Sequence, residues 1–452
     1  MEPPSKLNVS DLIDNSTLGA FQTGICILCC LCLIMDGFDV QAIGYVAPAI
    51  IQDWKIPPSA LGPVFGAAPL GILVGSLLFS MLADKMGRRP VLIGLTVMFS
   101  VLTLLTARAS SIPELLVIRF IAGMGLGGIQ PNGMALMGEY SPRAVRILLM
   151  MIVSNGFNVG AAFGGFVSAW LIPSFGWRSV FYFGGIVPLV IAALMFFLLP
   201  ESLQFLVLKG TQAGNVRKWL KRIAPHAPVT GTTQFAVREE KREGMRFLQL
   251  FQEGRATATI LLWLINFMNL VNVFLLASWL PTVAKTAGYS TSTAVLVGTT
   301  LQVGALIGTV VLGWLIERLG FIPVLTTCFL IACINIALIG QPGLSLLLLF
   351  VVVFIAGWCI PGAQPGVNAL SATYYPTNLR STGIGWGLGV GRIGAIIGPV
   401  LAGEMIRLKW SNQEVFLAAA VPALISALFV ISLRWVIRPQ AASSAKTEVM
   451  AH

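Results

Sequence analysis

Apolar residues in this chain gather in twelve runs of about 20 residues, the length that a helix needs to cross the hydrocarbon core of a bilayer. Short polar segments separate the runs. The pattern therefore predicts an all-α integral membrane protein with twelve membrane-spanning helices. The expected spans are 19–46, 60–82, 90–108, 113–138, 147–172, 178–199, 257–281, 292–316, 322–341, 344–372, 382–406 and 414–436.

One polar segment is much longer than the others and divides the spans into two sets of six. The sequence thus predicts a leader over 1–18, a first half over 19–199, a loop over 200–255, a second half over 256–437 and a tail over 438–452. The loop, which includes "KGTQAGNVRKWLKRIAPHAPVTGTTQFAVREEKREG", is both basic and amphipathic. This stretch predicts a linker that lies along the membrane surface.

Composition and charge agree with a membrane location. Charged residues make up only 10% of the chain, whereas soluble domains contain about 25%. The net charge is +11, but Lys and Arg lie between the apolar runs and form no single stripe, which argues against nucleic acid as a partner. When the loops are assigned to alternate sides, the side with both termini holds 21 of the 29 Lys and Arg residues. The positive-inside rule then predicts cytoplasmic termini.

The two halves are related by an internal repeat. The segment "FIAGMGLGGIQPNGMALMGEYSPRAVR" at 120–146 aligns without a gap with "FIAGWCIPGAQPGVNALSATYYPTNLR" at 354–380, and 12 of 27 positions are identical. Two homologous six-helix halves are typical of transporters that bind their substrate between repeats. An alignment of the first spans, anchored on Pro48 and Pro281, places Asp36 opposite Asn269 and Asp39 opposite Asn272.

Two carboxylates lie inside the first predicted span. Asp36 and Asp39 are three residues apart and therefore share one face of a helix. A carboxylate at the bilayer centre costs about 2.5–3.5 kcal/mol on insertion scales, and burial and mutual repulsion both favour the protonated form. We expect the pair to carry protons. The alternative is that they only hold helices together by pairing with Arg119.

Two arginines also fall inside spans. Arg119 has a permanent charge and needs an anion, either an aspartate or the substrate. Arg392 lies among glycines and is the better candidate to bind a carboxylate with its two-pronged guanidinium. The alternative for Arg392 is a pair with Glu404. Glu139 is assigned to the proton-coupling set, with an ordinary interfacial charge as the alternative.

A charged turn follows the second span. "SMLADKMGRRP" contains Asp84, Lys85, Arg88 and Arg89, and "GWLIERLG" repeats the arrangement in the second half with Glu317 and Arg318. Asp84 is expected to meet the positive N-terminal end of the eleventh span near Arg380. These residues form the predicted cytoplasmic gate.

"SMLADKMGRR" resembles the loop signature of the major facilitator superfamily, from which Ser80 and Lys85 depart, and "RFIAGMGLGG" resembles its fourth-span motif. "DGFD" in the first span is similar to the aromatic acid:proton symporter group, which takes up compounds such as 4-hydroxybenzoate, protocatechuate and benzoate. The resemblance covers the whole chain. It implies a monomeric carrier in the bacterial inner membrane.

These observations together predict proton-coupled uptake of a small aromatic carboxylate by alternating access. No enzymatic activity, no metal and no organic cofactor are expected, and protons act as the coupling ion. The substrate and the lipid bilayer are the expected partners. From their positions in the spans, six further residues are expected to line the substrate site beside Arg392: Tyr45, Asn155, Asn158, Trp358, Gln364 and Tyr374.

Other functions remain open at the level of sequence. A drug exporter of the same superfamily is the nearest alternative, although the fifth span reads Gly164–Gly165 where such exporters often carry Gly-Pro. A sugar or organic-cation carrier is a second alternative, and Arg392 would repel a cation. A chemoreceptor that evolved from a transporter is a third. A membrane enzyme is disfavoured because the long loop offers no catalytic set of residues.

Overall fold

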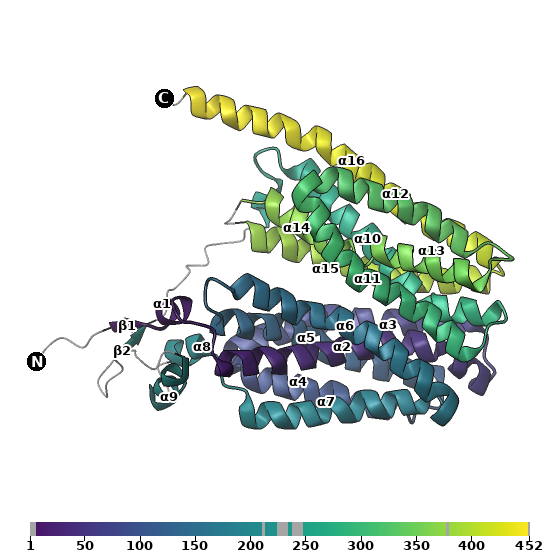
Figure 1. Cartoon of the computed structure of the whole chain (residues 1–452), viewed down its shortest axis with the longest axis horizontal. Coiled ribbons are helices and arrows are strands. Elements are labelled where there is room, and N and C mark those ends of the chain that lie inside the picture. Colours follow the sequence, from purple (N-terminus) through teal and green to yellow (C-terminus); the bar gives the residue numbers. More distant parts are fainter. Residues whose placement is uncertain (1–5, 210–212, 224–233, 237–246, 377–378, 451–452) are drawn as a thin grey trace, which may run out of the picture. The chain divides into compact units, whose positions relative to one another are not determined.

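A computed structural model describes residues 6–209, 213–223, 234–236, 247–376 and 379–450. Within this part, twelve helical segments are long and apolar enough to cross a membrane, which confirms the predicted fold class. Figure 1 shows their order along the chain. The helices that form the twelve segments are α2 (Ala20–Trp54), η1 with α3 (Pro58–Leu61 and Gly62–Met86), α4 (Arg88–Thr106), α5 (Ile112–Tyr140), α6 (Arg146–Phe175), α7 (Arg178–Leu198), α10 (Ala256–Thr286), α11 (Thr291–Leu319), α12 (Phe321–Ile339), α13 with α14 (Leu346–Cys359 and Gln364–Tyr374), α15 (Arg380–Arg407) and α16 (Asn412–Met450).

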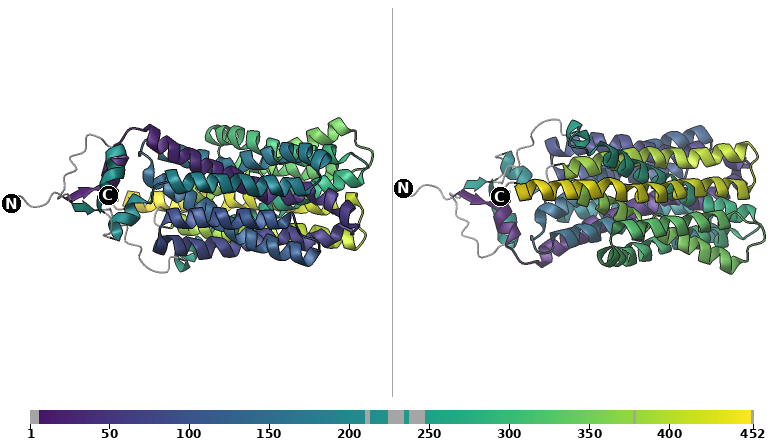
Figure 2. Two further views of the ribbon diagram at one scale, coloured as in Figure 1. Left: turned by 90° about the horizontal axis from the view of Figure 1, so that it is seen from below. Right: turned by 90° about the horizontal axis from the view of Figure 1, so that it is seen from above.

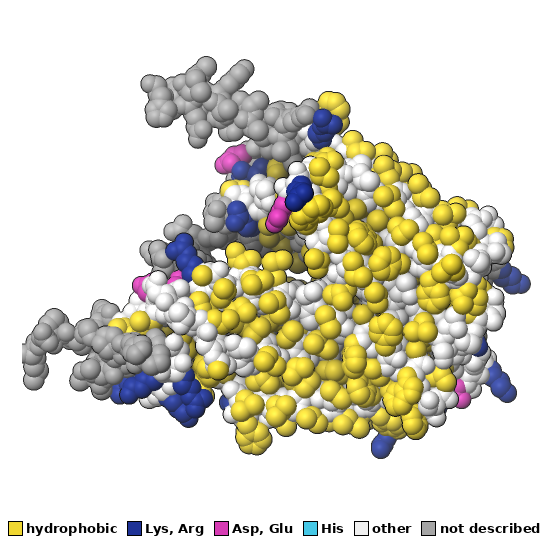
Figure 3. Space-filling view, in the orientation of Figure 1, with side chains coloured by type: hydrophobic (Ala, Val, Ile, Leu, Met, Phe, Trp, Pro, Cys, Tyr) yellow, Lys and Arg dark blue, Asp and Glu magenta, His cyan; other side chains and the backbone are white. Residues whose placement is uncertain are grey.

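The long helices expose apolar side chains along their sides. Phe197 of α7 is 80% exposed and Leu347 of α13 is 76% exposed. On the face seen in Figure 3, hydrophobic side chains cover the helices, while Lys and Arg gather near the helix ends. Such a surface suits contact with lipid, because apolar patches of this extent are rare on soluble monomers.

The tenth predicted span is not one continuous helix. It breaks between α13 and α14, and Pro361 and Gly362 lie in the break. Proline lacks the backbone N–H that a helix interior requires, and a Cβ at Gly362 would overlap with the backbone of Trp358. In the interruption the carbonyl of Ile360 accepts from the backbone N–H of Ala363 at 3.2 Å and also from a side chain of α10, described below.

The described chain forms two compact units. The first contains the described parts of Met1–Val40, Gly71–Ala161 and Arg178–Arg242, and the second contains Gln41–Leu70, Ala162–Trp177 and the described parts of Glu243–His452. Within the first unit, glycines permit close helix packing: a Cβ at Gly37 of α2 would overlap with Phe157 of α6, and one at Gly160 of α6 would overlap with Ile34. Small residues serve this purpose in membrane helices generally.

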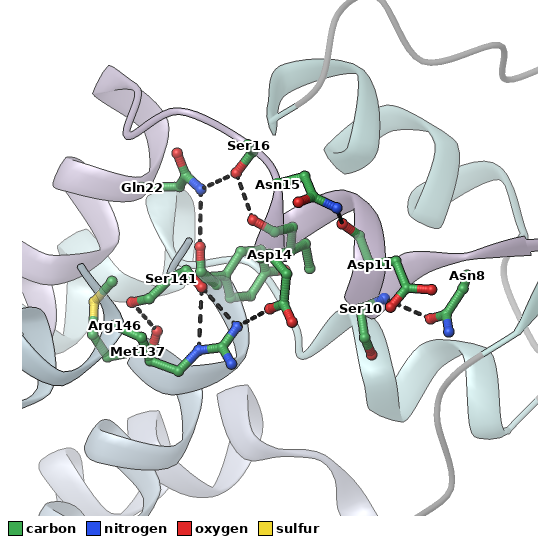
Figure 4. A network of polar contacts seen from close by, with 12 residues as sticks. Asn8, Ser10, Asp11, Asp14, Asn15, Ser16, Gln22, Met137, Ser141 and Arg146 are labelled. Atoms are coloured by element: carbon green, nitrogen blue, oxygen red, sulfur yellow. Dashed lines mark hydrogen bonds and ion pairs between the residues drawn. The ribbon is translucent and has the colours of Figure 1, made fainter. Parts of the chain in front are cut away.

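The described part of the leader, from Lys6 onward, is folded and belongs to the first unit. Strand β1 (Lys6–Asn8) pairs in parallel with β2 (Gln234–Ala236) of the long loop, and the short helix α1 (Val9–Asp14) follows. Figure 4 shows that Asp14 forms an ion pair with Arg146, at the start of α6. Gln22 donates to the carbonyl of Tyr140 at 2.9 Å and to Ser16 at 3.2 Å. These contacts hold the leader against the turn between α5 and α6.

Two short helices of the long loop lie beside the leader at the end of the first unit, α8 (Leu203–Leu208) and α9 (Ala213–Ile223), and η2 (Leu248–Phe251) precedes α10 (Figures 1 and 2). One part of the loop that was predicted to lie on the membrane surface forms α9, but its apolar residues Val216, Leu220 and Ile223 are buried within the protein. The surface-linker prediction is therefore wrong for α9, where Phe21 of α2 also stacks on Trp219 with 5.3 Å between the ring centres. Residues 210–212, 224–233 and 237–246 of that loop lie outside the described residues.

Candidate functional site

A fully buried ion pair joins Asp39 of α2 and Arg119 of α5. The two guanidinium nitrogens of Arg119 donate to the two carboxylate oxygens of Asp39, at 3.2 Å (Nη1 to Oδ1) and 2.8 Å (Nη2 to Oδ2). Nη2 also donates to the Asp39 carbonyl at 3.0 Å, and both side chains are 0% exposed. Fork-like pairing of this kind is the strongest geometry for a carboxylate and an arginine. Asp39 and Arg119 both lie in the first unit.

Thr103 of α4 completes this arrangement. Its hydroxyl donates to Asp39 Oδ1 at 2.7 Å. The guanidinium carbon of Arg119 lies 5.9 Å from the centre of the Phe181 ring of α7, so that α2, α4, α5 and α7 all surround the charges. A buried ion pair is tolerated only where its remaining hydrogen-bonding groups are satisfied, and Nε of Arg119 is buried without a partner. The pair is thus tightly held but not fully satisfied.

Asp36 lies on the same helix as Asp39 and is also buried, at 4% exposure. The prediction that both aspartates lie inside the protein is therefore correct in its geometry. The predicted pairing with Arg119 is made by Asp39. The structure distinguishes two carboxylates that the sequence treats as one pair.

Glu139 lies at the end of α5 and pairs with Arg88 of the charged turn, with 2.6 Å between Oε1 and Nε. Its Oε2 is buried and has no partner. This contact brings a residue of the predicted proton-coupling set together with a residue of the predicted gate. It lies in the first unit, as do Asp84 and Lys85, which are both exposed.

The start of α4 is capped by Glu201, from the segment after α7. Its Oε1 accepts from the backbone N–H groups of Arg88 at 2.9 Å, Arg89 at 3.1 Å and Ser202 at 2.8 Å. A carboxylate is stabilising at a helix N-terminus because free N–H groups and the helix dipole both favour negative charge. The preceding Gly87 has φ +103, a conformation that suits glycine. The charged turn is thereby tied to the segment that follows α7.

We expect Glu201→Ala to destabilise the protein by about 1–2 kcal/mol, because the cap is lost and backbone donors are left without a partner. The effect would be measured as a lower melting temperature of the purified protein in detergent. Glu253→Ala is the matched control, because Glu253 is exposed and pairs only locally with Arg255. Equal melting temperatures for the two variants would contradict the capping role.

The gate residues of the second half lie in the second unit and are exposed. Arg318 stacks on Trp314, with its guanidinium carbon 4.1 Å from the ring centre. Glu317 and Arg380 are exposed at the ends of α11 and α15. The predicted contact between Asp84 and Arg380 would join the two units and stays a prediction.

Arg392 lies in the middle of α15 and is partly exposed. The alternative partner suggested for it, Glu404, is bound elsewhere: Arg407 Nε donates to Glu404 Oε2 at 2.8 Å. Because this salt bridge already supplies Glu404 with a cation, Glu404 does not account for Arg392. The assignment of Arg392 to an anionic substrate stays a prediction.

A cluster of amide side chains lies on α10 and α14 of the second unit. Gln364, predicted to line the substrate site, donates to Asn266 at 2.9 Å and to Asn368 at 3.2 Å. It accepts from Asn269 at 2.6 Å. The internal repeat places Asn269 opposite Asp36 without indicating a role for it, and no sequence pattern distinguishes Asn266 or Asn368.

The other residues predicted to line the site are dispersed. Asn158 donates to Asn155 at 3.0 Å on α6, and both are partly exposed in the first unit. In the second unit, Tyr45 is 1% exposed and packs beside Gly298. Trp358 is partly buried at the end of α13, and Tyr374 packs edge-on against Tyr375 at the end of α14. These positions span both units.

A family profile, related sequences and a solved structure were compared with this chain, and all of them are of transporters. The sequence profile described as Major Facilitator Superfamily matches residues 29–244 and 262–450. The chain is 39% identical to the 4-hydroxybenzoate transporter PcaK of Pseudomonas putida over 94% of this chain and 95% of that protein. It is 37% identical to the gallate transporter of Pseudomonas putida, over 96% of both chains. The crystal structure of a D-xylose-proton symporter has the same fold, with a TM-score of 0.73 at 19% identity over 91% of this chain and 97% of that one.

Proposed function

Because the chain belongs to the major facilitator superfamily, whose members are transporters and not enzymes, we propose that it takes up a small aromatic carboxylate together with protons by alternating access. The names of two relatives that align over almost their whole length, a 4-hydroxybenzoate transporter and a gallate transporter, support this substrate class. The observation that carries the coupling is the buried pair of Asp39 and Arg119.

The proton step follows from the electrostatics of this pair. Protonation of Asp39 removes the charge that holds Arg119, and the fork-like contact loses most of its attraction. Thr103 can still bond to the neutral carboxyl group, which keeps the side chain in position. Asp36, one turn away and also buried, offers a second protonation site in the same helix. Release of Arg119 is the local change that would couple protonation to helix movement.

The substrate carboxylate is assigned to Arg392, on the second unit. A guanidinium presents two parallel N–H groups that match a carboxylate, and its charge persists at any physiological pH. An anion bound at Arg392 and protons bound at the aspartates together remove charge from the interior of the carrier. Closure around the substrate is then less costly, because burying unpaired charge is strongly unfavourable.

The proposal includes location and assembly. Both termini face the cytoplasm of a bacterial cell, as the Lys and Arg distribution favours, and the carrier lies in the inner membrane. It works as a monomer, because each chain contains both repeats and hence a complete set of site residues.

Reconstituted liposomes provide the direct test. Labelled 4-hydroxybenzoate should accumulate when the outside is made acidic, and accumulation should fail when the pH gradient is collapsed. A voltage imposed alone separates the stoichiometries. One proton per monoanion is electroneutral, whereas two protons would add a driving force of about 2.3 kcal/mol per 100 mV. Uptake that ignores an inward proton gradient would rule out the symport.

Replacing Arg392 with alanine should weaken equilibrium binding of the aromatic acid by about 10- to 100-fold, because hydrogen bonds to charged groups contribute about 1.5–3 kcal/mol. The dissociation constant would be measured by calorimetry on purified protein. Arg407→Ala on the same helix is the control, because Arg407 is exposed and bound to Glu404. Unchanged affinity in Arg392→Ala would move the anion site elsewhere, and Arg119 would be the next candidate.

A further inference from the structure

The amide cluster of the second unit has a fixed orientation. Gln364 uses both hydrogens of its amide nitrogen, one to Asn266 Oδ1 at 2.9 Å and one to Asn368 Oδ1 at 3.2 Å. Asn269 likewise uses both, one to Gln364 Oε1 at 2.6 Å and one to the Ile360 carbonyl at 3.3 Å. Because these donors are committed, neither amide can be turned around without breaking two hydrogen bonds.

The amide oxygens of the cluster can still accept hydrogen bonds. Asn269 is 0% exposed, and its Oδ1 is buried with no hydrogen-bond partner. Gln364 Oε1 accepts one hydrogen bond and has a second lone pair, and its side chain is partly exposed. A buried acceptor without a partner costs about 1–3 kcal/mol. A ligand that brings a hydrogen-bond donor to this place would remove that cost.

The backbone marks the same place. The tenth span is interrupted between α13 and α14, and the Ile360 carbonyl in the interruption accepts from Asn269 as well as from the backbone N–H of Ala363. In transporters, spans interrupted by Gly or Pro mark binding sites, since irregular backbone inside a membrane is tolerated where it lines a cavity. The interruption and the unpartnered acceptor are independent observations, and both lie at the contact of α10 with α14.

The cluster lies next to the helix that carries Arg392. Gly391 and Gly387 of α15 face α10 at Asn266: a Cβ at Gly391 would lie 3.4 Å from the Asn266 carbonyl oxygen, and one at Gly387 would lie 3.5 Å from its Nδ2. Arg392 directly follows the first of these glycines. The guanidinium and the amides are therefore carried by adjacent helices at the same level of one unit.

We infer that the amide cluster recognises a hydroxyl group on the aromatic ring of the substrate, with Gln364 as the contacting residue and Asn269 and Asn266 as the residues that position it. This inference rests on the proposed function and adds the substituent to it. A phenolic O–H is a donor and can bond to the second lone pair of Gln364 Oε1. An unsubstituted ring brings no donor to this acceptor, and sites built to bond a hydroxyl discriminate strongly against analogues that lack it.

Equilibrium binding of 4-hydroxybenzoate and benzoate to the purified protein tests the inference. We expect the unmodified protein to bind the hydroxylated acid at least about tenfold more tightly, the ratio that one hydrogen bond to a buried acceptor provides. Gln364→Met has a similar size but no amide, and it should reduce this ratio to near one by weakening only the binding of 4-hydroxybenzoate. Asn269→Leu should change the ratio in the same direction.

Gln413→Met serves as the control and should keep the original ratio, because Gln413 is exposed on α16 and bonds to Gln341. Retained benzoate binding shows that a variant is folded. If Asn269→Leu loses both acids, Gln364→Met decides the question alone. Equal binding of the two acids by the unmodified protein, or an unchanged ratio in Gln364→Met, overturns the hydroxyl subsite. Absence of binding of both acids by the unmodified protein instead contradicts the proposed function, and the subsite with it.

Discussion

Asp39→Asn is expected to abolish proton-driven accumulation of substrate while leaving exchange of substrate across the membrane measurable. Asparagine has nearly the size of aspartate and can still bond to Thr103 and Arg119, but it cannot take up a proton. The carrier would then move substrate down its own gradient only. Two assays measure this. The first follows uptake of labelled acid into liposomes with and without an inward proton gradient, and the second follows exchange of labelled acid outside for unlabelled acid inside.

Asp11→Asn is the matched control, because Asp11 is exposed on α1 and is changed in the same way. Its accumulation should equal that of the unmodified protein. Comparison of Asp36→Asn with Asp39→Asn separates the roles of the two carboxylates. If accumulation survives in each single variant and fails only in the double variant, the two carboxylates act as one coupled site. Accumulation that persists in the double variant would end the proton-coupling proposal.

Arg119→Leu should lower the stability of the protein by about 3–5 kcal/mol, because it leaves the fully buried Asp39 carboxylate without its cation. The expected result is a large drop in the melting temperature and in the yield of folded protein. The double variant Arg119→Leu/Asp39→Asn should regain much of that stability, since no unpaired charge stays behind, but it should not regain proton-driven accumulation.

This pattern separates a structural role from a coupling role. If the pair only held helices together, the double variant would recover transport along with stability. If the single variant Arg119→Leu were as stable as the unmodified protein, the Asp39 carboxylate would have to be neutral or reach another cation there. The coupling energy between the two positions follows from the four proteins of a double-mutant cycle.

The sequence predicted the spans well because their signal is local. Twelve apolar runs became twelve helical segments, and their ends moved mainly where a helix continues beyond the apolar run. The first span was predicted to end at 46, but α2 continues to Trp54. Hydropathy measures what lies in lipid, whereas a helix ends where its hydrogen bonds stop.

Charges inside spans were also readable, since they are rare and costly there. Asp39 and Arg119 are identified for this reason. An ion pair between the aspartates and Arg119 was one of the two alternatives, and proton carriage was the other. Thr103 could not be found in this way, because a threonine within an apolar run is common and only its place beside Asp39 gives it meaning. Pro361 and Gly362 could have indicated a helix break, but the tenth span was predicted as one continuous helix over 344–372.

Contacts between segments far apart in the chain could not be predicted from the sequence. The apolar stripe of α9 predicts that it is covered by something, yet its pattern is the same whether lipid or protein covers it. Only the burial of Val216, Leu220 and Ile223 in the folded chain shows that the cover is protein. The repeat places Asn269 opposite Asp36. It does not reveal that Asn269 donates to Gln364 Oε1 on another helix, at 2.6 Å.

The pairing of β1 with β2 also sets an order of events during synthesis. Lys6 pairs with Gln234, so β1 waits for a partner strand that is made more than two hundred residues later. At about 5–20 residues per second, that wait is roughly 10–50 s. The whole first half is inserted meanwhile, and a bulky fusion joined ahead of Lys6 would occupy this end of the chain at the moment the strands must meet.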